Sequence, residues 1–134
     1  MPLDQAEANR VVNARWGKAT YLAPTVPIML RLVTSAQPGS PTAAGTEVAN
    51  AGGSAYAPQS ASAAAGNNAS AGAIATTGAI TFTNMPAATV TGLETWDSAG
   101  TPRRLAYGAL TASKTTALGD SLTIAAGQLT DTTT

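Results

Sequence analysis

The sequence predicts a small all-β protein, an antiparallel β-sandwich of jelly-roll type with a short N-terminal helix or arm. Short runs that alternate apolar and polar residues recur between turn signals spaced about eight to twelve residues apart. The 134 residues show neither the strand–helix alternation of a parallel sheet nor a heptad repeat. We expect one core, in residues 21–130, preceded by a helix or docking arm in 1–20 and followed by a tail in 131–134.

The one helix that the sequence predicts lies in the N-terminal segment. Asp4 is suited to cap its first turn, the helix runs to about Trp16, and Gly17 is placed to end it. Its apolar stripe is narrow, and a helix this short needs a surface to lean on. That surface is either the protein's own sheet or a neighbouring subunit in an assembly.

The next segments predict strands of uneven strength. Residues 28–33 form a first strand entered through a proline-marked segment, and residues 37–53 form a long exposed loop. Residues 56–65 and 71–77 are weak strands separated by a turn at 66–68, and a disordered low-complexity segment is the alternative.

Residues 79–97 predict the central hairpin of the fold. Apolar and hydroxyl-bearing residues alternate before the turn at 84–87, and Gly92 is expected to mark a bulge after it. Further strands are expected at 104–110, 122–124 and 128–130. The residues expected in the core are Leu30, Leu32, Ile80, Phe82, Val90, Trp96, Leu105, Tyr107, Leu122 and Ile124.

Charge and composition limit the classes of binding partner that the sequence favours. Seven basic and seven acidic residues cancel, which favours neither nucleic acid nor a membrane as a partner. No signal peptide or membrane-spanning segment is recognisable, so we expect synthesis in a host cytoplasm. The apolar residues are mostly small and bury little area each, which favours a homo-oligomer, with a trimer as one form.

Side chains that could carry chemistry are sparse. The chain has no cysteine or histidine, and its acidic residues do not cluster as metal ligands, so we expect no catalytic, cofactor or metal site. Glu94 and Asp97 could be a glycosidase-type carboxylate pair, but the favoured reading is two solvated charges beside a packed tryptophan.

Two groups of residues are candidates for contact with other molecules. Glycan binding by Trp96, Tyr56 or Tyr107 is open, although each is needed more in the core. The arginine doublet at 103–104 is interpreted either as part of a solvated strand edge or as a salt-bridge donor to a neighbouring subunit. The candidate docking residues are Val11, Val12, Arg15, Trp16, Arg103 and Arg104.

Several motifs in the C-terminal half resemble a known family. They are N-M-P-A-A-T-V-T at 84–91, W-D at 96–97, Y-G-A-L-T at 107–111 and the glycine-bounded ending at 119–130. Upstream, T-E-V at 46–48 and G-G-S-A-Y at 52–56 continue the likeness, with two extra residues before the glycines. The sequence resembles short virion proteins of tailed bacteriophages, especially of actinobacteria, which are variously named capsid decoration, minor capsid, tail fibre or minor tail proteins.

The resemblance implies a β-sandwich without catalytic residues and a place in the virion. The expected role is a capsid decoration or cement protein on the outer shell, bound in symmetric copies to the major capsid protein or other virion proteins. The alternative is a tail fibre or minor tail protein that contacts the host surface.

Overall fold

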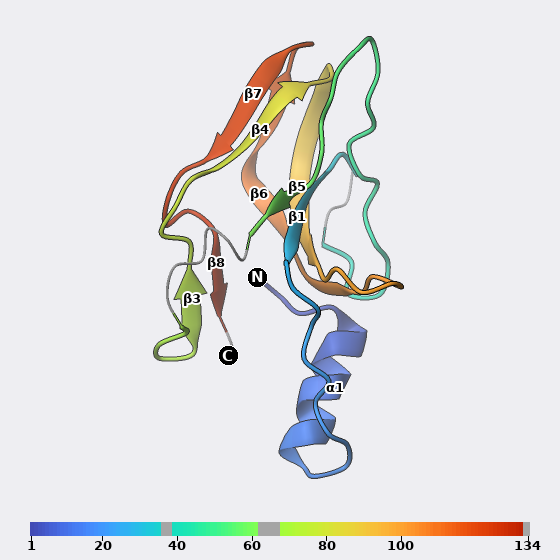
Figure 1. The fold of residues 1–134 in the computed structure, drawn as a ribbon, viewed down its shortest axis with the longest axis vertical. Coiled ribbons are helices and arrows are strands. Elements are labelled where there is room, and N and C mark those ends of the chain that lie inside the picture. The colour runs from blue at the N-terminus through green and yellow to red at the C-terminus, as the bar shows by residue number, and fades with distance from the viewer. Residues whose placement is uncertain (36–38, 62–67, 133–134) are drawn as a thin grey trace.

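One helix and eight strands form the protein, shown in Figure 1 as a computed structural model that describes residues 1–35, 39–61 and 68–132. The predicted all-β fold with a short N-terminal helix is confirmed. The predicted turn at 66–68 and loop at 37–53 fall partly outside the described residues. The elements are α1 (Gln5–Arg15), β1 (Met29–Val33), β2 (Gln59–Ser60), β3 (Ala73–Ala75), β4 (Ile80–Met85), β5 (Ala88–Trp96), β6 (Arg104–Thr116), β7 (Asp120–Ile124) and β8 (Thr130–Thr132).

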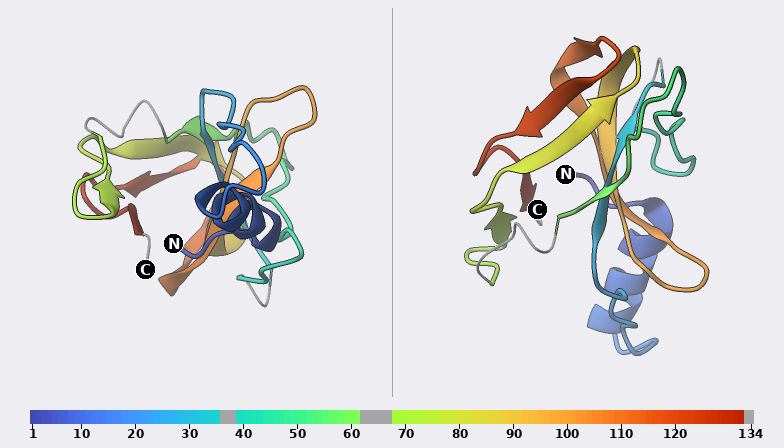
Figure 2. Two further views of the ribbon diagram at one scale, coloured as in Figure 1. Left: turned by 90° about the horizontal axis from the view of Figure 1, so that it is seen from below. Right: turned by 45° about the horizontal axis from the view of Figure 1, so that its top comes forward.

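Helix α1 begins and ends where the sequence predicts. The Asp4 side chain accepts a hydrogen bond from the Ala6 N–H at 2.9 Å, which satisfies one of the free donors of the first turn. At the other end, Gly17 has a φ of 64°, the left-handed conformation that glycine adopts without a steric penalty. Figure 1 and the right view of Figure 2 show the helix projecting from one end of the β-strands.

The largest sheet has four antiparallel strands in the order β2-β1-β5-β6. The bulge expected at Gly92 is present: Val90 faces Lys114, whereas Gly92 faces Ala109, so β6 contains extra residues there. Strand β6 extends to Thr116, beyond the 104–110 predicted from the sequence.

The predicted hairpin at 79–97 consists of two strands that do not pair with each other. Strand β4 pairs with β7, while β5 lies in the large sheet between β1 and β6. The pairing in the prediction is therefore wrong. The chain changes layers at Pro86, which is buried, has no N–H for a sheet ladder and accepts a hydrogen bond from the Thr116 hydroxyl at 2.7 Å.

The third pair of strands, β3 and β8, is short and antiparallel. Because β8 covers residues 130–132, the predicted C-terminal tail at 131–134 begins inside a strand, and residues 133–134 lie outside the described part. The two small pairs lie beside the large sheet, and the β6–β7 turn is at the end opposite α1 (Figures 1 and 2).

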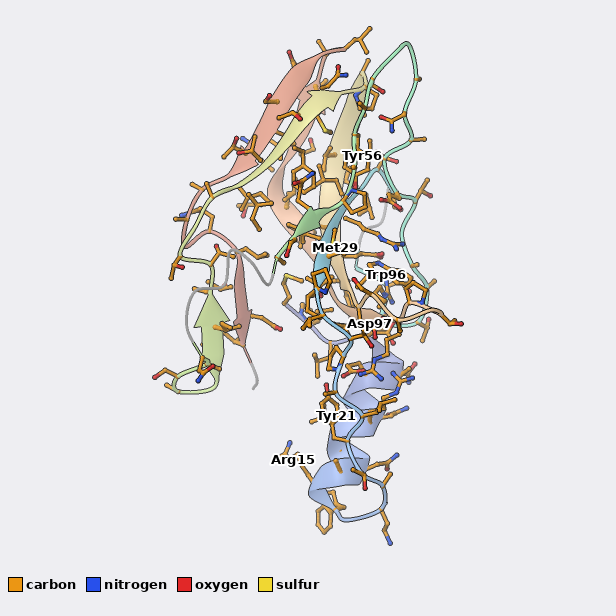
Figure 3. The ribbon with its side chains drawn as sticks, in the orientation of Figure 1. Arg15, Tyr21, Met29, Tyr56, Trp96 and Asp97 are labelled. Atoms are coloured by element: carbon orange, nitrogen blue, oxygen red, sulfur yellow. The ribbon has the colours of Figure 1, made fainter. Side chains whose placement is uncertain are left out.

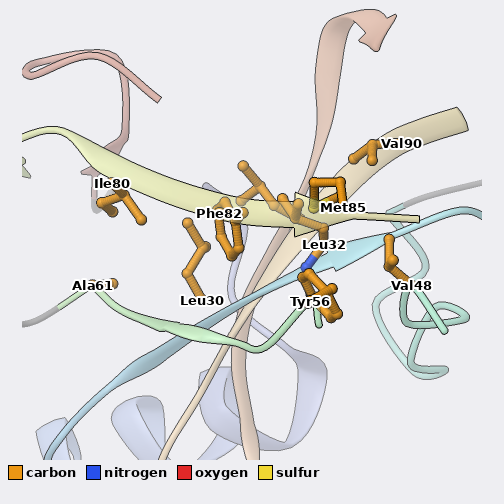
Figure 4. Close-up of a cluster of buried hydrophobic side chains, with 10 residues drawn as sticks. Leu30, Leu32, Val48, Tyr56, Ala61, Ile80, Phe82, Met85 and Val90 are labelled. Atoms are coloured by element: carbon orange, nitrogen blue, oxygen red, sulfur yellow. The ribbon is translucent and has the colours of Figure 1, made fainter. Parts of the chain in front are cut away.

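The hydrophobic core lies between the large sheet and the β4–β7 pair (Figure 4). Phe82 is completely buried, and its ring stacks on that of Tyr56 with centroids 5.8 Å apart. Of the predicted core residues, Leu30, Leu32, Ile80, Phe82 and Val90 belong to the buried cluster, Leu122 and Ile124 are partly buried against it, and Leu105 and Tyr107 are buried outside it.

Trp96 differs from the core prediction because it is only partly buried. The Arg31 guanidinium lies 4.4 Å from the centroid of its ring, and its indole N–H donates to Glu94 at 3.0 Å. The indole therefore bridges β1 and β5 at the edge of the core, where its polar N–H finds an acceptor.

Candidate docking surface

The start of α1 is attached to β6 through Asp4. One carboxylate oxygen caps the helix, while the other accepts a hydrogen bond from the Arg104 Nε at 2.9 Å. The Asp4 N–H donates to the Leu105 carbonyl at 2.9 Å, and Leu3 forms a β-bridge with Ala106. Cap and attachment therefore use the two oxygens of one carboxylate, so Arg104 holds the capping side chain in place.

Arg104 is the centre of this attachment. It is 5% exposed, and its Nη1 donates to Glu94 at 2.9 Å and to the Ala43 carbonyl at 2.8 Å, while its Nη2 donates to the Ser40 carbonyl at 2.7 Å. Burial lowers the pKa of Arg104, but its hydrogen bonds with the Glu94 and Asp4 carboxylates outweigh this effect and raise the pKa above its usual value.

Glu7 forms a second attachment one turn further along the helix. It is 2% exposed, lies 3.2 Å from the Arg10 Nη1 and 3.5 Å from the Arg103 Nε, and accepts a hydrogen bond from the Tyr21 hydroxyl. Burial and the bond to Glu7 raise the pKa of Tyr21 to about 12. The returning chain after the helix is thereby fixed to the same carboxylate as the helix itself.

Asp97 completes this group from the end of β5. Its carboxylate accepts hydrogen bonds from the N–H groups of Arg103, at 2.8 Å, and Thr25, at 3.3 Å. Burial raises the pKa of Asp97, but these backbone donors outweigh it and hold the pKa below its usual value. We call the whole group the ionic anchor; its members are Asp4, Glu7, Glu94, Asp97, Arg103 and Arg104.

The ionic anchor corrects two sequence expectations. Glu94 and Asp97 are not solvated charges, because they are 3% and 4% exposed. Arg103 and Arg104, expected at a docking surface, bind carboxylates of their own chain, with Arg104 almost fully buried. No local pattern indicated these ion pairs, since the partners lie up to 100 positions apart in the chain.

The far end of α1 is apolar and exposed. We define the apolar tip as the two exposed apolar side chains at the last turn of the helix and its C-cap. Figure 3 shows Arg15 on this projecting end, away from the strands, and Tyr21 further back beside the helix. The members of the apolar tip are Val12 (48% exposed) and Trp16 (78% exposed). Leu22 and Val26 are also exposed but lie nearer the sheet, because the Leu22 carbonyl accepts a hydrogen bond from Arg103, and the neighbours of Val26, Thr25 and Pro27, bind Asp97 and Ser98.

The charges beside the apolar tip have one sign. Arg15 and Lys18 are exposed and take part in no ion pair among residues 1–35, 39–61 and 68–132. Exposed apolar surface next to unpaired cations is typical of a contact site, because such surface is costly to leave in water.

The structure thus brings together part of the predicted docking set. Val12, Arg15 and Trp16 are exposed on the projecting helix, and Val11 is half-buried. Leu22 and Val26 were missed by sequence reasoning, although they stand in a proline-marked segment that forms no strand. Large apolar residues in such a segment are a usable signal, because nothing in the local pattern buries them.

The aromatic residues considered for glycan binding do not form an exposed platform. Tyr56 is 6% exposed and Tyr107 is 9% exposed. The Tyr56 hydroxyl accepts a hydrogen bond from the Leu32 N–H at 3.0 Å, and burial raises the pKa of Tyr56. The most exposed aromatic side chain described is Trp16.

The comparison with protein families covers nearly the whole chain. Residues 3–132 match the family described as podophage GP4 fiber I protein gp80. The chain belongs to this phage fibre protein family. It is a structural component of a phage virion, as the resemblance in its sequence implied. No curated protein matches the sequence significantly.

Among the described residues, no helix is long and apolar enough to cross a membrane.

Proposed function

We propose that the chain is a non-enzymatic subunit of a virion fibre and that its apolar tip makes the contacts that hold it in the assembly. The family match over residues 3–132 carries this proposal, because the family is described by a fibre protein. Of the two roles expected from the sequence, the fibre role therefore takes precedence over capsid decoration.

The separation between charged side chains in the interior and apolar side chains at the exposed tip supports a structural role. The charged side chains in the interior serve the fold: Glu94 binds Arg104, the Gly45 N–H and the Trp96 indole, and Asp97 binds backbone N–H groups. These are hydrogen bonds that organise loops, and they occupy the pair of carboxylates that could have suggested glycoside hydrolysis. The surface that is left without partners is apolar and basic, which suits assembly.

The partners proposed are other virion proteins and further copies of the same chain. The apolar tip contains only a few large side chains, so one contact is weak and repeated contacts in a symmetric assembly add up. A trimer is one arrangement that supplies such repetition. Under the competing proposal of capsid decoration, the same tip would dock on the major capsid protein.

Gold labelling of intact particles with an antibody against the chain tests the role. A fibre subunit places gold on thin appendages and is present in few copies per particle by quantitative proteomics. Label spread over the head, with hundreds of copies, would establish decoration instead; absence of label from every part of the particle would overturn both roles.

The contribution of the apolar tip is tested with point variants in particles. A deletion of residues 1–18 is unsuitable, because it removes Asp4 and Glu7 from the ionic anchor. Trp16→Ala should reduce incorporation of the chain into particles. The matched control is Leu118→Ala, an exposed apolar residue (54%) in the turn at the opposite end, which should be incorporated normally. Equal incorporation of both variants would refute the role of the tip.

A further inference from the structure

A cavity of about 240 Å³ lies on the flank of the molecule, between the β3–β8 pair and the start of β6. Most of its wall is apolar, with Ile28, Ile74, Leu105 and Leu129 among the lining residues. Sites for small molecules usually measure about 300–1,000 Å³, so this cavity is sized for one large side chain rather than a cofactor.

Two polar residues stand in this apolar wall. Thr76 is 5% exposed, and its hydroxyl oxygen is buried without a hydrogen-bond partner among the described residues. Asp131 also lines the cavity; its side chain is 45% exposed and its carboxylate lies 3.6 Å from the Met1 amino group. Thr76 is itself one of the lining residues, and a threonine hydroxyl can accept a hydrogen bond as well as donate one.

We propose that this cavity receives the Trp16 indole of a second copy of the chain, so that copies join head to tail. An indole has a large apolar body and a single N–H donor, which matches an apolar wall containing one unpaired acceptor. Trp16 is also 78% exposed and has Arg15 and Lys18 beside it, whose charge is opposite to that of Asp131; the carboxylate is 45% exposed beside its pairing with the Met1 amino group.

Trp16 cannot fill the cavity of its own chain. The cavity is lined by Met1 and Leu105, which lie at the start of α1, whereas Trp16 follows its last residue. At about 1.5 Å per residue, the 11 residues of α1 separate these two points by roughly 16 Å. The occupant must therefore come from another molecule.

A contact between two different surfaces of the same chain is heterologous. When this contact is repeated, the copies close into a ring if each is related to the next by a pure rotation that divides a full turn. Otherwise they grow into a helical filament. Either outcome is a way to build a fibre from copies of this subunit. The inference deepens the proposed function, since it names the partner of the apolar tip as another copy of the chain.

A complementation experiment with two variants of the full chain tests the contact. Trp16→Ala removes the inserted side chain but keeps the cavity, and Ala75→Arg places a cation at the cavity while Trp16 stays intact. Both residues are exposed, so neither change should affect folding, which circular dichroism verifies. Association is measured by sedimentation velocity at concentrations up to about 1 mM, where contacts of only about 4 kcal/mol are half-formed.

We expect the wild-type chain to associate with rising concentration and each variant alone to remain a monomer. An equimolar mixture of the two variants has one intact cavity and one intact Trp16, so it should form dimers and nothing larger. The control Leu118→Ala should associate as the wild type does. A wild-type monomer at the highest concentration, association of either variant alone, or a mixture that stays monomeric would each overturn the proposal.

The result is distinguishable from a failure of the fibre assignment. Gold on particle appendages together with a protein that does not self-associate would refute the head-to-tail contact alone. Self-association through Trp16 in a protein absent from particles would refute the virion role alone.

Discussion

The two ends of helix α1 place charge and apolar surface in opposite ways. At its start, Asp4 and Glu7 join the ionic anchor, and Glu7 is 2% exposed. At the other end, Val12 is 48% exposed and Trp16 is 78% exposed. An intact buried ion pair adds little net stability, but removal of one partner is costly because the other charge stays buried. Exposed apolar area, by contrast, favours binding when a partner covers it. The base of the helix is therefore fixed to the sheet, and its tip is left free for the contacts proposed above.

Loss of Arg104 should show the largest effect at the base. Arg104→Ala leaves the Asp4 and Glu94 carboxylates without their cation, Glu94 in a buried position, and should lower the free energy of unfolding by about 3–5 kcal/mol. Urea denaturation measures the change. Arg15→Ala, at an exposed arginine, serves as the control and should stay within about 0.5 kcal/mol of the wild type. Similar values for the two variants would show that the anchor carries no stability.

Asp97 should contribute in a pH-dependent way. Asp97→Asn weakens two backbone hydrogen bonds and an ion pair, and should cost about 1–3 kcal/mol at neutral pH. Because folding lowers the pKa of Asp97, its contribution is full above the unfolded pKa of about 3.9 and is lost as the pH falls through the lower folded pKa. Denaturation curves of wild type and variant should therefore converge in acid. A constant difference down to acid pH would contradict this assignment.

Tyr21 should contribute less, and at the opposite end of the pH scale. Tyr21→Phe removes the hydrogen bond to Glu7 and should cost about 1 kcal/mol at neutral pH. Its raised folded pKa, about 12, means that its stabilisation is present below the unfolded value of about 10 and is lost as the pH rises towards 12. Tyrosinate absorbance followed against pH measures the folded pKa; titration of this residue near 10 would contradict the burial of its hydroxyl against Glu7.

The tip should show the smallest effect on stability. Trp16→Ala removes a side chain with few contacts in its own chain, so the free energy of unfolding should change by less than about 0.5 kcal/mol. Denaturation followed by circular dichroism tests this without relying on the removed fluorophore. A loss above 2 kcal/mol would mean that the indole packs within its own molecule, and the contrast between base and tip would disappear.

Local sequence signals were sufficient for individual elements. Asp4 and Gly17 predicted both ends of the helix, because capping and a left-handed glycine depend on neighbours in the chain. The alternation around Phe82 predicted a strand with an apolar face and a hydroxyl face. On the exposed face, the hydroxyl oxygens of Thr81 and Thr123 lie 3.1 Å apart and form a hydrogen bond. Gly92 predicted a bulge that the register of β5 and β6 contains.

The same signals could not decide which strands pair. Phe82 in β4 and Val90 in β5 are both fully buried, and that pattern arises whether two strands lie side by side or face each other across a core. The candidate site depended on the same kind of information. Arg104 and Asp4 are 100 positions apart, so nothing local distinguished a buried ion pair from a solvated arginine.

By itself, the sequence determined an all-β chain with one capped helix, a neutral charge and a likeness to phage virion proteins. Only the tertiary structure decided that the arginine doublet lies inside the ionic anchor and that Val12 and Trp16 remain outside as an apolar tip. The physical reason is that caps, turns and alternation are set by neighbours along the chain. Burial of a charge or exposure of an indole is set by segments that only folding brings together.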